Sequence, residues 1–172
     1  MEITICQAAE ADCELISDLG RITVEEAHRD SCSAGDMSDY LARNYNYDAI
    51  RSELLDRRNI YHIIYADSQP AGFSKIVLNA AHPDIPEGSV TKLDRIYLLK
   101  EFYDMKLGLA LLQFNIQFSK EHNQSGMWLF TWIGNTRAVS FYQKAGFTVI
   151  GTHDFQVSET HYNPNHHMLL GY

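Results

Sequence analysis

The sequence lacks an uninterrupted apolar stretch of the roughly 18 residues that a membrane-spanning helix needs. Its first six residues carry neither the basic nor the apolar segment of a secretory signal peptide. Cysteine is scarce: there are three, an odd number, and Cys6, Cys13 and Cys32 do not have metal-ligand spacing. We therefore expect free thiols in a reducing cytoplasm, and no membrane partner.

Basic residues are also few, with 14 Lys and Arg against 22 Asp and Glu, for a formal net charge of −8. A broad basic face for nucleic acid is therefore not expected. An acidic surface concentrates cations, which is compatible with a cationic substrate, although many acidic proteins owe that charge to solubility alone. With 172 residues, no internal repeat and no flexible linker, the chain is expected to form a single domain over residues 1–172.

Hydrophobic periodicity predicts an α/β fold in which a mixed sheet of six or seven strands carries helices on both faces. The expected helices span residues 10–28, 37–44, 47–57, 105–122 and 135–145. The expected strands span residues 2–6, 60–66, 71–79, 90–99, 127–133, 147–157 and 167–172. Residues 31–36 and 80–89 are expected to be loops, and residues 67–70 a turn.

The most informative segment is the run from Asn135 to Phe147, directly after an apolar strand. Asn135 is a good N-cap residue, and Gly146 can adopt the left-handed conformation that ends a helix. Helical spacing places four side chains on one face: Ala138, Phe141, Tyr142 and Ala145. Spacing alone is equally typical of an ordinary strand–helix–strand unit.

The identities of these residues are more specific. The run Asn-x-x-Ala-x-x-Phe-Tyr-x-Lys-x-Gly-Phe resembles the acyl-CoA-binding end of the GNAT N-acetyltransferase superfamily. The whole chain can be laid along that fold, although residues 91–150 carry the specific signal. The resemblance implies the GNAT acyl-CoA N-acyltransferase fold and acetyl transfer from acetyl-CoA by direct attack of a small-molecule primary amine. A homodimer is common in the superfamily, but the sequence leaves the oligomeric state open.

The acceptor amine is less well defined. Residues 40–55, with Tyr-Leu-x-x-x-Tyr and then a helix that ends Glu-Leu-Leu, resemble the polyamine-acetylating branch, which implies an acceptor such as spermidine. Aromatic and leucine stripes of this kind are more often simply core. An amino acid, an amino sugar and a protein N-terminus remain alternatives, as does a non-catalytic acyl-CoA-binding or regulatory module with the same fold. A domain of an unrelated α/β class is a further alternative.

Pyrophosphate is best held by backbone N–H groups at a helix N-terminus, and residues 98–110 contain the expected strand-to-helix step. The superfamily pattern there is Gln/Arg-x-x-Gly-x-Gly/Ala, whereas this chain has Tyr103-Asp-Met-Lys106-Leu-Gly108. Lys106 replaces the first glycine, and either it adds charge near the phosphates or it is simply solvated. The expected coenzyme-binding residues of this loop are Tyr103, Lys106, Leu107, Gly108, Leu109 and Ala110.

The preceding strand is expected to place Lys92, Asp94, Ile96 and Leu98 on one face. The resemblance implies that the backbone of Ile96, Tyr97 and Leu98 binds the pantetheine arm. A backbone N–H group here, that of Leu98, would polarise the thioester oxygen.

Asp94 is the catalytic carboxylate that this strand offers. It would accept a proton from the substrate ammonium, through water, or anchor that ammonium. Deprotonation needs help because an alkylamine has a pKa near 10.4 and is almost fully charged at pH 7. The alternative for Asp94 is an ion pair with Arg95 or Lys92.

By the same resemblance, Tyr142 is the general acid that protonates the leaving thiolate, unless it is one more aromatic of the buried stripe. Asn135 would bind the pantetheine amides, and Lys144 would contact the 3′-phosphate. No metal is expected, because the eight histidines form no recognisable ligand cluster and His166 and His167 would face opposite sides of a strand. The cysteines have no partner base, which argues against an acetyl-cysteine.

Overall fold

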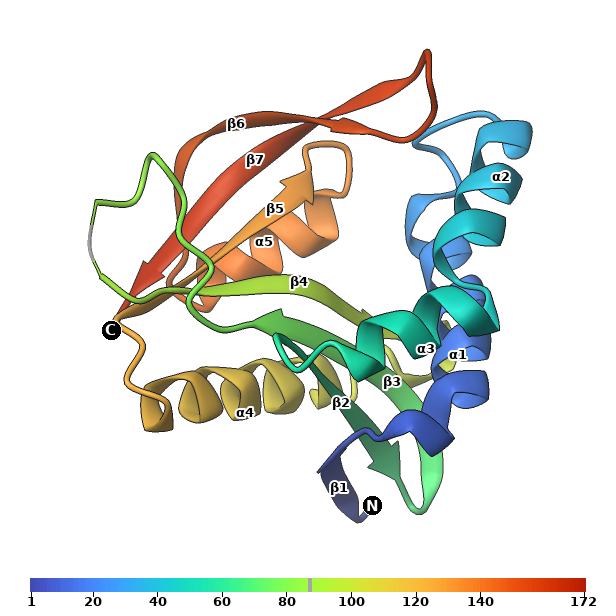
Figure 1. The fold of residues 1–172 in the computed structure, drawn as a ribbon, viewed down its shortest axis with the longest axis horizontal. Helices are drawn as coiled ribbons and strands as arrows, with labels where there is room; N and C mark the ends of the chain where they lie inside the picture. The colour runs from blue at the N-terminus through green and yellow to red at the C-terminus, as the bar shows by residue number, and fades with distance from the viewer. Residues whose placement is uncertain (87) are drawn as a thin grey trace.

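One seven-stranded mixed sheet organises the molecule (Figure 1). The structure is a computed structural model that describes residues 1–86 and 88–172. The strands lie in the order β1-β2-β3-β4-β5-β7-β6; β4 and β5 run parallel, and the other neighbours are antiparallel. Their bounds are Ile3–Gln7 (β1), Asn59–Ala66 (β2), Gln69–Val77 (β3), Thr91–Leu98 (β4), Gly126–Trp132 (β5), Thr148–Gln156 (β6) and Tyr162–Gly171 (β7).

Helices cover both faces of the sheet, as the sequence predicted. The helices are Cys13–His28 (α1), Ala34–Asn44 (α2), Tyr47–Leu55 (α3), Leu107–Glu121 (α4) and Thr136–Lys144 (α5). Two 3₁₀ turns, Glu10–Asp12 and Lys100–Phe102, precede α1 and α4. Within residues 1–86 and 88–172, none of the helices combines the length and apolar character that crossing a membrane requires.

Strand β2 shows how the two layers form, because successive side chains of a strand point to opposite faces. Ile63 packs with Ile16 of α1 and Ile50 of α3, whereas its neighbour Ile64 packs with Leu107 of α4. Both isoleucines are fully buried. Burial of such a side chain stabilises a fold by about 1.5–3 kcal/mol, so β2 helps to hold both helical layers against the sheet.

Some expected boundaries were wrong. Helix α2 begins at Ala34, so Gly35 lies in the helix and not in a loop; the hydroxyl of Ser33 accepts a hydrogen bond from the N–H of Asp36 at 3.0 Å and caps it. Strand β7 begins at Tyr162, five residues before the expected start at residue 167. Pro164 concealed this start, since proline normally interrupts a strand, but here it lies where pairing with β5 has just ended.

Candidate functional site

The site lies where the parallel strands β4 and β5 separate, at the centre of the sheet. Strands β4 and β5 pair only at Thr91 with Met127 and at Lys92 with Trp128, and then diverge (Figure 1). On its other side β4 continues to pair with β3 as far as Leu98. In the described part of the chain, the second half of β4 therefore presents an edge without a strand partner, and its N–H and C=O groups can bind an extended ligand.

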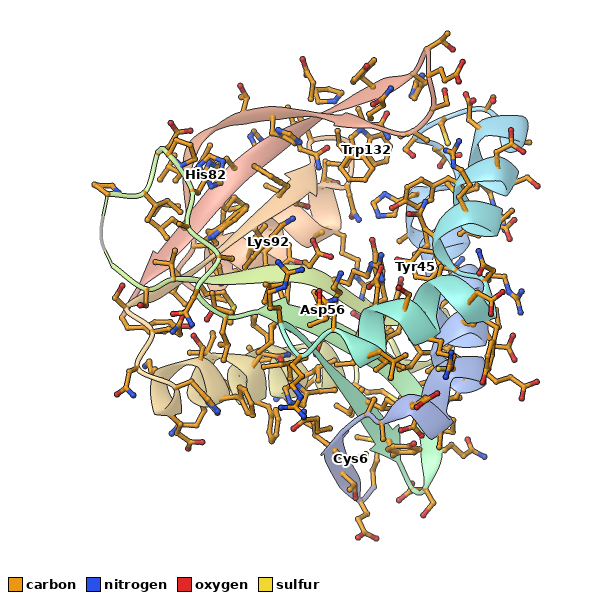
Figure 2. All side chains as sticks on the ribbon, viewed as in Figure 1. Cys6, Tyr45, Asp56, His82, Lys92 and Trp132 are labelled. Atoms are coloured by element: carbon orange, nitrogen blue, oxygen red, sulfur yellow. The ribbon has the colours of Figure 1, made fainter. Side chains whose placement is uncertain are left out.

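This edge borders a cavity of about 900 Å³. That volume lies at the upper end of the range for small-molecule and cofactor sites. Figure 2 labels three of its lining residues, Tyr45, Lys92 and Trp132, which come from the end of α2, from β4 and from β5. The lining includes most of the predicted site: Asp94, Ile96, Tyr97, Leu98, Tyr103, Lys106, Leu107, Gly108, Leu109, Asn135 and Tyr142. Two predicted residues, Ala110 and Lys144, are not part of this lining, and Lys144 is exposed on α5.

The first turn of α4 borders this cavity. Among the described residues no side chain caps this helix end, and the first helical bond runs from the N–H of Ala110 to the carbonyl of Lys106. Lys106 itself has a φ of 63°, the left-handed conformation that glycine adopts most easily. The backbone thus keeps the shape of the missing glycine, and it adds a lysine beside an uncapped, electropositive helix end.

Gly108 leaves room on the cavity side of α4. A Cβ atom at this position would lie 3.5 Å from Leu98 and 3.9 Å from Phe141, which are ordinary contacts. The surrounding protein therefore does not itself require glycine here. A free helix end, an unpaired strand edge and this open position together fit an extended ligand with a phosphate end.

A second cation was missed by the sequence reasoning. The guanidinium of Arg137, on α5, lies 4.1 Å from the ring centroid of Tyr103, and it donates a hydrogen bond to Asp104 at 3.0 Å. Arg137 and Tyr103 both line the cavity. The arginine therefore joins α5 to the loop before α4. It lies two residues after Asn135, at a position of the α5 sequence that gave no signal for this contact.

On α5 the predicted capping residue caps its helix, and Tyr142, the residue predicted as the acid, lines the cavity. The side-chain oxygen of Asn135 accepts a hydrogen bond from the N–H of Ala138 at 3.1 Å, and Gly146 ends the segment with a φ of 98°. Tyr142 is 8% exposed, and its ring packs edge-on against Phe147. Its hydroxyl has no hydrogen-bond partner among residues 1–86 and 88–172, and burial raises its pKa, so the phenol keeps its proton at neutral pH.

The prediction that Asp94 and Ile96 lie on the same face of β4 was wrong. Lys75 of β3 pairs with Arg95 and the next residue, Ile76, pairs with Leu93, so Asp94 is an extra, bulged residue. Asp94 consequently lies on the side of α3, whereas Ile96 packs on the side of α4. A one-residue bulge reverses which face of the sheet the following side chains point to. The alternation of residues along the sequence does not show where such a bulge lies.

Asp94 belongs to a network of five charges. Its two oxygens contact the ammonium groups of Lys75 at 3.0 Å and Lys92 at 2.8 Å. Glu53 of α3 joins the network, with Lys75 at 2.8 Å and Arg95 at 3.0 Å. Burial alone would raise the pKa of Asp94, but the two lysines outweigh it and hold that pKa well below its usual range. The ion pair with Lys92 is therefore present, while Arg95 binds Glu53 instead.

His28 is a cavity residue that the sequence reasoning did not identify. Its Nε2 atom lies 3.1 Å from the hydroxyl of Tyr97, and both residues line the cavity. Burial lowers the pKa of His28 to about 4, so the imidazole is neutral at pH 7 and has a nitrogen able to accept a proton. Nothing in the sequence marked one histidine near the end of a long helix as a partner for a strand residue 69 positions away.

The far side of the cavity is formed by α2 and the β6–β7 hairpin, where Arg43 donates a hydrogen bond to the carbonyl of Val157 at 2.9 Å. Among the acidic residues of the front helices, Glu26 reaches the lining, and its carboxylate accepts a hydrogen bond from the backbone of Lys100 at 3.0 Å. The charged residues of the lining are Arg43, Lys92, Arg95, Lys106, Arg137, Glu26, Asp94 and Asp104. Basic groups thus outnumber acidic ones inside the cavity, although the chain as a whole carries −8.

The histidines do form one cluster, contrary to the sequence-based expectation. His82 and Asp84 of the loop before β4 meet His167 of β7, and one potential ligand atom from each lies within 4.8 Å of the others. The loop and the strand are more than 80 positions apart, so spacing along the chain did not reveal this group. These three residues lie outside the residues that line the cavity.

Comparison with known proteins adds independent information. The sequence profile of the acetyltransferase (GNAT) family matches residues 22–147. A protein of Lactobacillus delbrueckii subsp. lactis, described as an uncharacterized N-acetyltransferase in the pepI 3′ region, is 26% identical over 157 residues and aligns with 91% of each chain.

Two solved structures illustrate the similarity of fold. The PaiA N-acetyltransferase of Thermoplasma acidophilum, in complex with coenzyme A, superimposes with a TM-score of 0.80 at 21% identity, over 100% of both chains. The ribosomal-protein-S18-alanine N-acetyltransferase of Escherichia coli gives a TM-score of 0.72 at 15% identity, over 99% of this chain and 94% of the other. At these identities the similarity establishes the fold that surrounds the cavity.

Proposed function

The chain belongs to the GNAT acetyltransferase family, and on that premise we propose that it moves an acetyl group from acetyl-CoA to a primary amine by direct attack. One observation carries the proposal. Three groups border the same cavity of about 900 Å³: the end of α4, the edge of β4 and the hydroxyl of Tyr142. Within residues 1–86 and 88–172, the helix end has no capping side chain, the strand edge no strand neighbour and the hydroxyl no hydrogen-bond partner. These are the groups that acetyl transfer from a thioester requires in one place.

The coenzyme would be held by two kinds of group. Backbone N–H groups of Leu107, Gly108 and Leu109, at the positive end of α4, suit the pyrophosphate, with Lys106 and Arg137 as nearby cations. The free edge of β4 from Ile96 to Leu98 suits the amides of the pantetheine arm, together with the amide of Asn135. Lys144 remains a proposed contact of the 3′-phosphate from outside the cavity lining.

The chemical step needs a hydrogen-bond donor to the thioester oxygen, an acid for the leaving thiolate and a base for the amine. The N–H of Leu98 is the proposed donor to the thioester oxygen, worth about 3 kcal/mol in comparable oxyanion sites. Tyr142 is the proposed acid, since a protonated phenol can donate to a thiolate whose pKa is about 8.5. His28 is the proposed proton acceptor in place of Asp94, because both Asp94 oxygens contact lysines. Its pKa of about 4 makes it a weak base, although a free nitrogen of the neutral ring can accept a proton.

Two acceptor classes are worth distinguishing. The sequence resemblance favours a polyamine such as spermidine. The lining of the cavity favours an amine that also carries an anionic group. In that lining Asp94 is neutralised by Lys75 and Lys92, while Arg43 has no carboxylate partner among the described residues. Putrescine and ornithine form a matched pair for this question, because they differ by a single carboxylate.

The first experiment is calorimetric titration with acetyl-CoA, followed by turnover with spermidine, putrescine and ornithine. Micromolar binding and amine-dependent turnover would support the proposal, and no binding near millimolar acetyl-CoA would overturn it. Higher kcat/KM for spermidine than for ornithine would support a polyamine acceptor. A preference for ornithine over putrescine that Arg43→Gln abolishes would support the acceptor with an anionic group.

Two further properties, the location and the oligomeric state, are also proposed. A cytoplasmic location is supported by Cys6, Cys13 and Cys32, all of which are free thiols in the structure. A homodimer is supported by its frequency in the superfamily, and sedimentation velocity of the purified protein would test it.

A further inference from the structure

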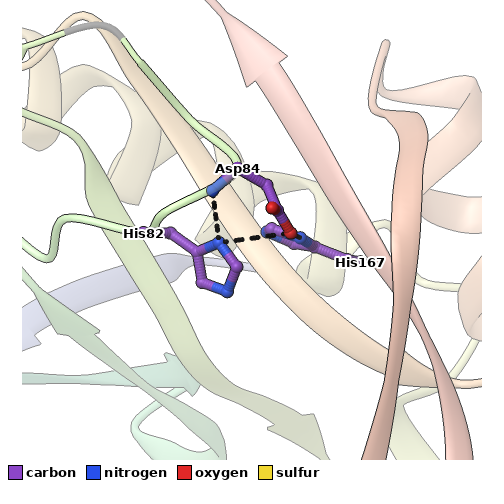
Figure 3. Close-up of side chains that lie close together, drawn as sticks. All are labelled: His82, Asp84 and His167. Atoms are coloured by element: carbon purple, nitrogen blue, oxygen red, sulfur yellow. Dashed lines mark hydrogen bonds and ion pairs between the residues drawn. The ribbon is translucent and has the colours of Figure 1, made fainter.

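His82, Asp84 and His167 form a cluster (Figure 3), and none of the three is among the residues that line the cavity. The loop between β3 and β4 brings its first two members over the sheet, and β7 supplies the third. The Oδ2 atom of Asp84 lies 3.7 Å from Nδ1 of His82 and 3.9 Å from Nδ1 of His167. A single carboxylate oxygen therefore faces two imidazole nitrogens from parts of the chain that are distant in sequence.

One hydrogen bond lies within the cluster: the backbone N–H of Asp84 donates to Nδ1 of His82 at 3.2 Å (Figure 3), and a metal ion at that nitrogen would replace it. The Asp84 carboxylate itself makes no hydrogen bond to either imidazole among the described residues. Separations of 3.7 and 3.9 Å between the carboxylate oxygen and the ring nitrogens are longer than hydrogen bonds. His167 is only 1% exposed; its Nδ1 faces Asp84, and its buried Nε2 has no hydrogen-bond partner among the described residues. An unsatisfied buried polar atom costs about 1–3 kcal/mol, so hydrogen bonds do not account for the burial of this imidazole beside a carboxylate.

We propose that His82, Asp84 and His167 bind a divalent transition-metal ion, with zinc as the first candidate. Two imidazoles and one carboxylate form a common donor set for this ion, and a water molecule would complete a tetrahedron. In tetrahedral zinc sites, bonds of about 2.0–2.2 Å place neighbouring ligand atoms about 3.3–3.6 Å apart. The two separations that involve Asp84 need to shorten only slightly, and Asp84, at 65% side-chain exposure, can move to achieve this. The three ligand atoms lie within 4.8 Å of one another, so the two imidazoles would also draw closer around the ion.

The surroundings favour a structural role for the ion. Trp128 and Phe130 of β5 pack against both histidines. The ring centroids of His82 and His167 are 4.2 Å apart. Such packing holds the two imidazoles in place before metal arrives. Because the cluster lies outside the cavity lining, the ion would fasten the loop before β4 to strand β7, and the proposal does not depend on acetyl transfer.

The test uses the full chain after treatment with a chelator and removal of that chelator. Zinc binding is measured by calorimetry and by metal analysis after equilibrium dialysis. We expect one zinc ion per chain with micromolar or tighter affinity and a higher melting temperature in its presence. Asp84→Asn and His82→Gln, which alter residues that are not fully buried, should each lower the affinity at least about 10-fold, since even loss of an outer partner costs that much.

Matched controls are Asp39→Asn and His122→Gln, two exposed residues on α2 and after α4 that should leave zinc binding unchanged. Cobalt offers a second readout, because tetrahedral coordination gives intense visible absorption bands that Asp84→Asn should weaken. The proposal is overturned if zinc does not bind at one equivalent per chain. It is equally overturned if Asp84→Asn and His82→Gln both retain full affinity, because zinc is then held elsewhere.

Discussion

Arg137 covers the ring of Tyr103, with 4.1 Å between the guanidinium carbon and the ring centroid. The contact joins α5 to the loop that precedes α4, two segments that the superfamily resemblance treats separately. Tyr103 occupies the position where that pattern has a glutamine or arginine. A guanidinium is thus present at the loop, but it is supplied by Arg137 of α5 and not by a residue of the loop.

The first prediction concerns this arginine. Arg137→Gln should weaken binding of coenzyme A by about 10-fold, or 1.4 kcal/mol, because it removes a cation from the lining of the cavity beside the end of α4. Calorimetric titration with coenzyme A measures the effect. Arg58→Gln is the matched control, since Arg58 pairs with Asp56 and lies outside the lining. Equal affinities for the two variants would remove Arg137 from the site.

Lys106 provides a second test of the phosphate end. Lys106→Glu should weaken coenzyme A binding at least about 10-fold, because it places a negative charge at the uncapped end of α4. Lys100→Glu makes the same charge change six positions earlier, outside the cavity lining, and should change affinity much less. If both variants bind equally well, Lys106 is simply a solvated lysine.

The proposed acid gives a third prediction. Tyr142→Phe should lower kcat by about 10- to 1000-fold while acetyl-CoA affinity and melting temperature stay close to those of the unmodified protein. Only the hydroxyl is lost, and it has no hydrogen-bond partner in the described part of the chain, so folding should hardly change. Tyr162→Phe, at an exposed tyrosine of β7, is the control. Unchanged turnover would make Tyr142 a packing residue.

We expect the main effect of removing the Asp94 carboxylate to be a loss of stability, not a loss of activity. Asp94→Asn leaves Lys75 and Lys92 close together without their shared carboxylate, and should lower the free energy of unfolding by roughly 1–3 kcal/mol. Urea denaturation measures this, with Asp39→Asn as the control. Adding Lys92→Met should restore part of the loss. A stable variant that has lost only activity would instead favour the catalytic role.

His28 predicts how stability depends on pH. Its pKa is lowered from 6.5 to about 4 by burial, so below pH 6.5 the unfolded chain binds a proton that the folded chain does not. Stability should therefore fall as pH decreases from 6.5 towards 4, by roughly 2 kcal/mol at pH 4.5 from this group. Denaturation at pH 7 and 4.5 should show a smaller loss in His28→Gln than in His122→Gln. Equal losses would mean that His28 titrates normally.

The sequence predicted the fold through its most regular parts. Residues 135–147 combine a capping asparagine, an apolar stripe and a terminating glycine, and the structure places all three as expected. These are local signals, and they do not depend on what packs against them. The same is true of β2, whose apolar run fits only a strand buried on both faces.

The site was less predictable where it depends on contacts between distant segments. The bulge at Asp94 reverses the faces of β4, and it arises from the register with β3. Glu53, His28 and Arg137 join the site from three different helices, with partners 33 to 69 positions away. No pattern within one element predicts such pairs, because tertiary packing decides which side chains meet.

The central claim is acetyl transfer to an amine, and the most direct measurement is thiol release from acetyl-CoA, with mass spectrometry of the product. We predict amine-dependent release of coenzyme A with an equal amount of N-acetylated product for at least one of spermidine, putrescine and ornithine, and strong impairment in Tyr142→Phe. Tight binding of acetyl-CoA without acetylated product from any polyamine, diamine or amino acid would contradict the claim and indicate a module that binds the coenzyme without catalysis.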